Sequence, residues 1–124
     1  MEHQLSAYYD ITHGLGLAIL TPRWMQYCLN ADTVGRFAQF AVNVFGVDSA
    51  LPDLEQAKEG IRLTAQFLFQ TLGLDDSFTK IGIGREHFAV MAQKTCDGGV
   101  LPAFVPLSAA DVEKIFEACL VGSV

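Results

Sequence analysis

Two of the three histidines, His3 and His13, lie ten residues apart near the start of the chain, and histidine side chains are common metal ligands. On one straight helix this spacing gives about 1000° of rotation and ~15 Å of rise, which leaves the two side chains ~80° apart. The pair could share an ion only if the helix broke between them, and residues 11–14 (ITHG) are weak helix formers. Asp10 could then be a third donor, which a metal site needs, but its spacing does not require that role. The alternative is a structural His13 and a solvated His3.

Other residues that could do chemistry give weaker signals. Gly14 and Gly16 match the start of a phosphate-binding loop, but position 19 is Ile where the full G-x-G-x-x-G pattern needs glycine, and no strand precedes them. We therefore expect these glycines to allow close helix packing. The Asp75–Asp76 pair is expected in a solvated turn, and His87 on the surface. No serine or cysteine has an evident base partner.

The three cysteines, Cys28, Cys96 and Cys119, are odd in number and share no C-x-x-C spacing. A disulfide framework is therefore not expected. We expect three buried, reduced thiols and a cytoplasmic location.

Composition limits the class of protein. The 124 residues suit one domain; 51% are hydrophobic and 18% charged, against ~25% charged in ordinary soluble domains. This shortage of charge suggests that a partner or a second copy covers part of the surface. The net charge of −6 and the lack of a Lys/Arg run argue against nucleic acid as a partner. The apolar run 15–20 is too short to span a membrane.

Helical periodicity dominates the chain, and no segment alternates apolar and polar residues for long enough to predict a strand. We therefore predict an all-α bundle of five or six helices in one domain, 1–124. Gly46 should end one helix, Ser49 or Asp48 should cap the next, and Ser108 with Asp111 should cap the last. Beyond the helical start of the chain, the predicted helices are 36–45, 48–73, 85–96 and 108–120, with loops at 74–84 and 97–106.

The stretch EHQLSAYYDITHGLGLAILTPRWM resembles the metal-dependent, iron-containing (group III) alcohol dehydrogenases. Within that family it is most similar to the butanol dehydrogenase and NAD(P)H-dependent aldehyde reductase branch. His3 matches the second histidine of the family's H-x-x-x-H, and His13 with Gly14 matches the HG pair that follows. The later stretches TPRWMQY, RFAQFAVNVFGVD, TLGL and GGVLPAFVPLSAADVEKIFEACL are typical of the carboxy-terminal helical domain of that branch.

The resemblance implies a site that is only partly encoded here. In the family an aspartate and three histidines hold one divalent metal, iron or zinc, and an amino-terminal α/β domain binds NADH or NADPH. His13 matches the last metal ligand. His3 matches a histidine near the substrate and the nicotinamide, and is the candidate catalytic residue. The other ligands and the cofactor domain would precede Met1, so we expect this chain to bind neither metal nor cofactor tightly.

Our leading interpretation is the carboxy-terminal part of an alcohol dehydrogenase that interconverts small alcohols and aldehydes, inactive by itself. The alternative is a free-standing helical module that binds itself or a partner without catalysis. In either case we expect a homo-oligomer, because the face that meets the cofactor domain in the family would be bare. The expected lining of that face is Leu5, Tyr8, Tyr9, Leu15, Ala18 and Ile19.

Overall fold

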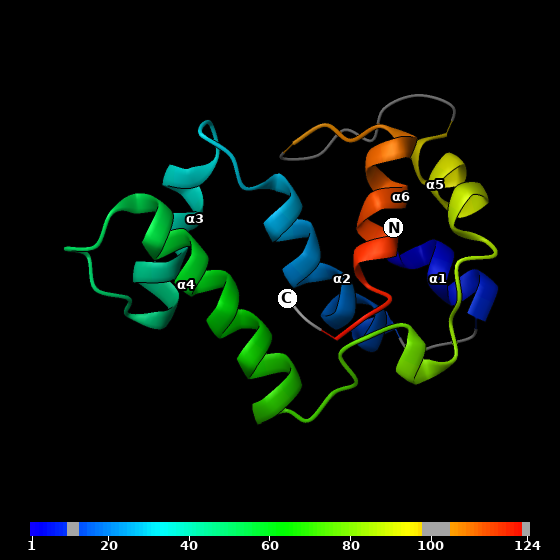
Figure 1. Ribbon diagram of the computed structural model, residues 1–124, viewed down its shortest axis with the longest axis horizontal. Helices are drawn as coiled ribbons and strands as arrows, with labels where there is room; N and C mark the ends of the chain where they lie inside the picture. The colour runs from blue at the N-terminus through cyan, green and yellow to red at the C-terminus, as the bar shows by residue number, and fades with distance from the viewer. Residues whose placement is uncertain (10–12, 98–104, 123–124) are drawn as a thin grey trace.

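The computed structural model describes residues 1–9, 13–97 and 105–122, without the side chains of His3, Ser6 and Tyr8. Within these ranges the protein consists of α-helices and short helical turns and has no β-strand, as predicted. Helix α2 runs through the middle of the molecule, with the α3–α4 hairpin on one side of it and α1, α5 and α6 on the other (Figure 1). The α-helices are α1 (Glu2–Tyr9), α2 (His13–Cys28), α3 (Val34–Phe45), α4 (Asp53–Gln66), α5 (Phe88–Cys96) and α6 (Ala109–Ala118).

His3 and His13 lie on two separate helices, which is the condition under which the two residues could approach each other. Helix α1 ends at Tyr9 and α2 begins at His13. The two helices contact each other. Asp10, the third donor considered above, lies outside the described residues.

Helices α3 and α4 form a tight hairpin. As predicted, α3 ends at Gly46, whose φ of 67° is in the left-handed region that favours glycine. At the crossing, a Cβ atom on Gly60 would lie 2.6 Å from the Cβ of Ala41, so only a hydrogen at position 60 permits this approach. The hairpin depends on this pair of small residues.

The predicted start of α4 is wrong by five residues. The helix begins at Asp53, with Pro52 as its N-cap in an extended conformation (ψ 151°). Asp48 accepts a hydrogen bond from the backbone N–H of Ala50 and so belongs to a turn before the helix. The helix gives way at its far end to a π-helical turn, Phe67–Thr71.

The last two helices pack around an aromatic cluster. The ring centroids of Phe78, Phe88 and Phe116 are 5.6–6.4 Å apart. Helix α5 begins three residues later than predicted, and the short 3₁₀ turn Thr79–Ile81 lies within the predicted loop. The predicted capping of α6 is confirmed: the backbone N–H of Asp111 donates to Ser108 Oγ, and that of Ser108 donates to the Asp111 carboxylate.

Burial confirms some predictions and corrects one. The three cysteines are buried and unbonded to each other, and His87 is exposed. However, Leu5 and Ile19, which were expected on a bare face, are fully buried in the core, and Ala18 is also buried. The fold of α1 onto α2 places these side chains inside. Among the described residues, no helix is both long and apolar enough to cross a membrane.

Candidate functional site

The side chain of His13, at the start of α2, contacts the carboxylate of Glu2, at the start of α1. The Nδ1 atom of His13 lies 2.8 Å from Glu2 Oε1. Only 2% of the Glu2 side chain is exposed, whereas 58% of the His13 side chain is exposed. One edge of the imidazole is therefore bound to a buried carboxylate while the ring as a whole reaches the surface.

Gly16 makes room for this carboxylate. A Cβ atom at position 16 would lie 2.6 Å from Glu2 Oε2 and 2.7 Å from Glu2 Cδ. These distances are shorter than any ordinary van der Waals contact, so a larger residue would displace the Glu2 side chain. The expectation that the glycines of this stretch allow close packing is confirmed at position 16, where the neighbour is a side chain of α1.

The structure brings together only part of the predicted site. His3 lies in α1, but its side chain is outside the described part, as is all of Asp10. Across residues 1–9, 13–97 and 105–122, no three His, Cys, Asp or Glu side chains are grouped closely enough to hold a metal ion. Sequence reasoning missed Glu2 as a partner of His13, because the contact exists only after α1 folds back.

A largely apolar groove runs along α2. One section, of about 590 Å³, lies between α2 and the end of α4, where Leu17, Leu68 and Leu72 line it. The next section, of about 500 Å³, is lined by Trp24 and Phe40 among others. Thr21 and Thr64 line both sections, so we describe them together as the α2–α4 groove.

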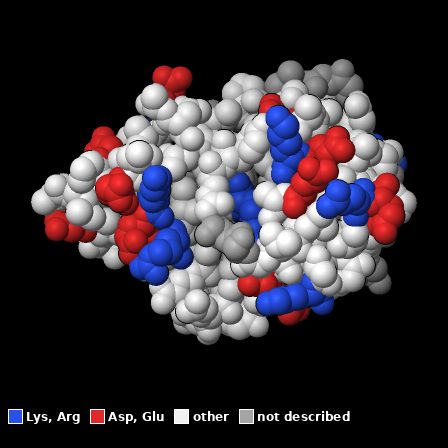
Figure 2. Space-filling view, in the orientation of Figure 1, with Lys and Arg blue, Asp and Glu red and all other residues white. Residues whose placement is uncertain are grey.

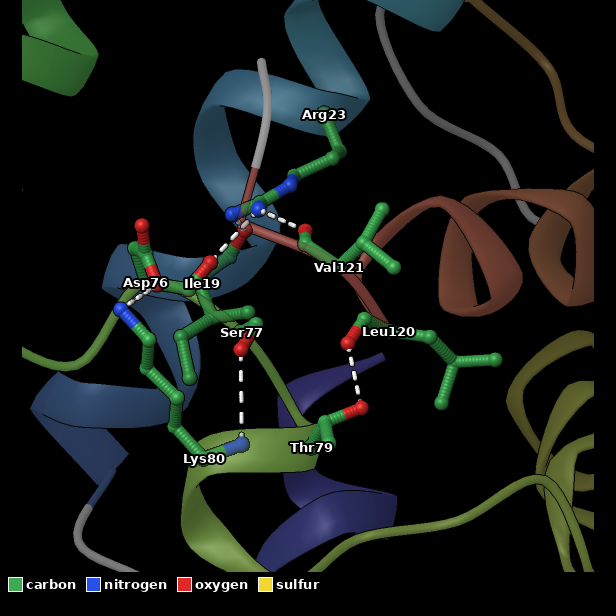
Figure 3. Close-up of polar contacts among 8 residues, drawn as sticks. All are labelled: Ile19, Arg23, Asp76, Ser77, Thr79, Lys80, Leu120 and Val121. Atoms are coloured by element: carbon green, nitrogen blue, oxygen red, sulfur yellow. Dashed lines mark hydrogen bonds and ion pairs between the residues drawn. The ribbon is translucent and has the colours of Figure 1, made fainter.

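A second polar centre, around Arg23, is internal. The guanidinium donates hydrogen bonds to the backbone carbonyls of Ile19 (3.1 Å), Asp76 (2.5 Å) and Val121 (2.7 Å), as Figure 3 shows. It also lies 5.5 Å from the centre of the Phe69 ring. Only 2% of Arg23 is exposed, and this burial lowers the pKa of its guanidinium. Two of these acceptors, Asp76 and Val121, lie 53 and 98 residues further along the chain. Arg23 therefore joins α2 to two segments that are distant in sequence.

We call the three hydrogen bonds from Arg23 to Ile19, Asp76 and Val121 the Arg23 clamp. Polar contacts between neighbouring residues add to it. Lys80 Nζ pairs with the Asp76 carboxylate at 2.8 Å, and the backbone N–H of Lys80 donates to Ser77 Oγ at 3.4 Å. The hydroxyl of Thr79 donates to the carbonyl of Leu120 at 2.6 Å (Figure 3). The expected solvated turn at the Asp75–Asp76 pair is therefore only partly right, because the second aspartate is half-buried and paired.

Within the described part of the chain, the remaining ionisable groups give no second candidate site. Burial raises the pKa of the Cys119 thiol to about 12, so it is not a nucleophile near neutral pH. The hydroxyl of Tyr27 donates to the Asp111 carboxylate, which raises the pKa of Tyr27 to about 12 and lowers that of Asp111. On the face in Figure 2, acidic and basic side chains alternate, and uncharged atoms cover much of the middle.

Comparison with known proteins gives consistent matches over nearly the whole chain. The family described as "Fe-containing alcohol dehydrogenase family, C-terminal" matches residues 1–120. NADH-dependent butanol dehydrogenase A of Clostridium acetobutylicum is 44% identical over 119 residues, covering 94% of this chain and 30% of the relative.

Two solved structures share the fold. A 1,3-propanediol oxidoreductase superposes with a TM-score of 0.82 at 25% identity, over 96% of this chain and 31% of its own. NADH-dependent butanol dehydrogenase A of Thermotoga maritima gives a TM-score of 0.80 at 29% identity, over 97% and 31%. The chain thus spans about 30% of the length of the curated relatives that it matches.

Proposed function

Because the chain belongs to the Fe-containing alcohol dehydrogenase family, where it corresponds to the C-terminal helical domain, we propose that it serves alcohol–aldehyde oxidoreduction in a larger protein. Relatives named as NADH-dependent butanol dehydrogenases support a short-chain alcohol substrate and NADH as the hydride carrier. The observation that carries the proposal is His13 at the start of α2, held at one ring nitrogen by a buried carboxylate.

The geometry at His13 fits a metal ligand. Metal-binding histidines commonly donate the N–H of their second ring nitrogen to a carboxylate or carbonyl group, which fixes the ring. Here Nδ1 contacts Glu2, so a metal ion would bind at Nε2. When bound, a divalent ion such as iron or zinc would supply Lewis-acid polarisation of the alcohol or aldehyde oxygen. We further propose that His3, one residue after Glu2, lines the substrate pocket, as the family resemblance implies.

The remaining parts of the active site would come from residues that precede this segment in the relatives. We propose that they supply the other metal ligands and the NADH-binding domain. The three buried, unpaired cysteines support a reducing compartment, and we propose the cytoplasm.

The test uses the chain expressed together with all residues encoded upstream of it in the same reading frame. We expect one bound divalent ion per chain and NADH-dependent reduction of butyraldehyde. His13→Ala should abolish both, whereas His87→Ala, at an exposed histidine, should leave both unchanged. Full metal content in the His13→Ala protein would contradict the proposal. A stop codon directly upstream would favour the alternative of an independent helical module.

The α2–α4 groove supports a second proposal, that the 124-residue chain self-associates. Leu17 and Leu72, which line the groove, are 43% and 54% exposed, although both are large apolar residues. Leu17→Glu should therefore shift the chain towards monomers in sedimentation at micromolar concentration. Val44→Glu is the control, because Val44 is more exposed but lies outside the groove. A monomeric wild-type chain would refute self-association.

A further inference from the structure

We propose that Glu2 is a positioning residue for His13, and that Gly16 is the residue that allows Glu2 to act. In this arrangement the buried carboxylate holds the proton of the neutral imidazole on Nδ1 and so presents Nε2 for a metal ion. The inference deepens the proposed function, since it names what prepares His13 for its ligand role.

The direction of the hydrogen bond follows from the chemistry of the two groups. An ionised carboxylate can only accept hydrogen bonds, so the neutral imidazole must donate its Nδ1–H to Glu2 Oε1 across the 2.8 Å contact. The other ring nitrogen then carries the lone pair that a metal ion requires. A histidine in water favours the opposite tautomer, with the proton on Nε2, so removal of Glu2 should change the proton's position.

The burial of Glu2 distinguishes this contact from an ordinary surface ion pair. Only 2% of its side chain is exposed, and a buried carboxylate is costly unless partners compensate it. It lies against the backbone of α2, where the missing Cβ of Gly16 leaves room for its Oε2 and Cδ atoms. Gly16 follows His13 by three residues and therefore lies on the same side of α2. Residues on both helices thus shape one place for this carboxylate.

The two glycines of α2 provide a matched pair of substitutions. Gly16→Ala should push the Glu2 carboxylate away from His13, while the carboxylate itself remains intact. Gly14→Ala makes the same chemical change two residues earlier, where no described atom lies within 4 Å of the added Cβ. Glu2→Gln adds a third variant, which keeps the shape of the side chain but removes its charge.

The first measurement is the tautomer of His13 in the 124-residue chain, read from ¹⁵N chemical shifts of the imidazole at a pH where it is neutral. His13→Ala assigns the signals. We expect the Nδ1–H form in the wild-type chain and in Gly14→Ala, and a shift towards Nε2–H in Gly16→Ala and Glu2→Gln. A wild-type Nε2–H form, or equal tautomers in the two glycine variants, would overturn the proposal. If Gly16→Ala does not fold by circular dichroism, Glu2→Gln decides.

The second measurement is zinc affinity in the protein that includes the upstream residues. Gly16→Ala and Glu2→Gln should weaken zinc binding by about 10- to 100-fold, which is the usual effect when a metal-binding histidine loses its hydrogen-bond partner. Gly14→Ala should match the wild type. If His13→Ala loses the metal but Glu2→Gln and Gly16→Ala keep wild-type affinity, Glu2 does not position the ligand and the proposed function still stands. If His13→Ala keeps the metal, the proposed function itself fails.

Discussion

Replacement of Arg23 should strongly destabilise the protein. Arg23→Met keeps most of the side chain's length but removes every donor to the carbonyls of Ile19, Asp76 and Val121. Ile19 lies within α2, where helical geometry supplies its carbonyl with a backbone donor, so its loss counts little. The other two carbonyls each lose a hydrogen bond to a charged group, and a lost bond of this kind costs about 1–2 kcal/mol where water can partly enter. We therefore expect the free energy of unfolding to fall by about 2–4 kcal/mol.

Urea unfolding with a fixed m-value measures this loss. Arg62→Met is the matched control, since the Arg62 side chain is 58% exposed and its partners among the described residues, Glu59 and Gln66, lie on the same helix, α4. Its effect should stay within about 0.5 kcal/mol. Arg23→Lys should fall between the two, because one ammonium group cannot replace a guanidinium that spans three acceptors. An Arg23→Met protein within about 1 kcal/mol of the wild type would refute the argument that this cation holds the segments together.

Three further predictions concern other contacts. Gly60→Ala should cost about 1–3 kcal/mol because its Cβ would collide with Ala41, and Ala41→Gly in the same chain should recover part of that loss in urea unfolding. The hydrogen bond from Tyr27 lowers the pKa of Asp111, so it stabilises the fold at pH values above the usual aspartate pKa. This stabilisation is lost as the pH falls through the lower pKa that Asp111 has in the folded protein. Tyr27→Phe should therefore raise the Asp111 pKa in an NMR titration and remove stability at neutral pH but not in strong acid. The isolated 124-residue chain should bind zinc weakly and without defined stoichiometry in calorimetry, and a tight one-to-one site lost on His13→Ala would contradict this.

The sequence predicted those helix boundaries that depend on contacts between residues close together in the chain. The capping box at Ser108 and Asp111 contains both partners within four residues, so the start of α6 follows from the sequence. Gly46 ends α3 for a similar reason, because its positive φ is a property of one residue. The start of α4 was misplaced because Asp48 forms a local turn instead of capping the helix, which begins only after Pro52.

Tertiary contacts account for what the sequence did not show. Leu5 and Ile19 were assigned to a bare face on the basis of the family fold, but their burial depends on how α1 packs against α2 and α5. Glu2 gave no signal of its role, since its partner is eleven residues away. Arg23 gave no signal, because its acceptors are carbonyl groups, which every residue has.

The Arg23 clamp also bears on how the protein is synthesised. Val121, one of its acceptors, follows Arg23 by 98 residues and therefore leaves the ribosome long after α2. Until residue 121 has been synthesised, the guanidinium lacks one of its three acceptors, so the contacts around Arg23 are completed late in translation of this segment. The α3–α4 hairpin, whose contacts are local, can form earlier. A nonsense mutation at codon 121 would therefore leave a buried arginine incompletely bonded and the shortened chain exposed to proteolysis.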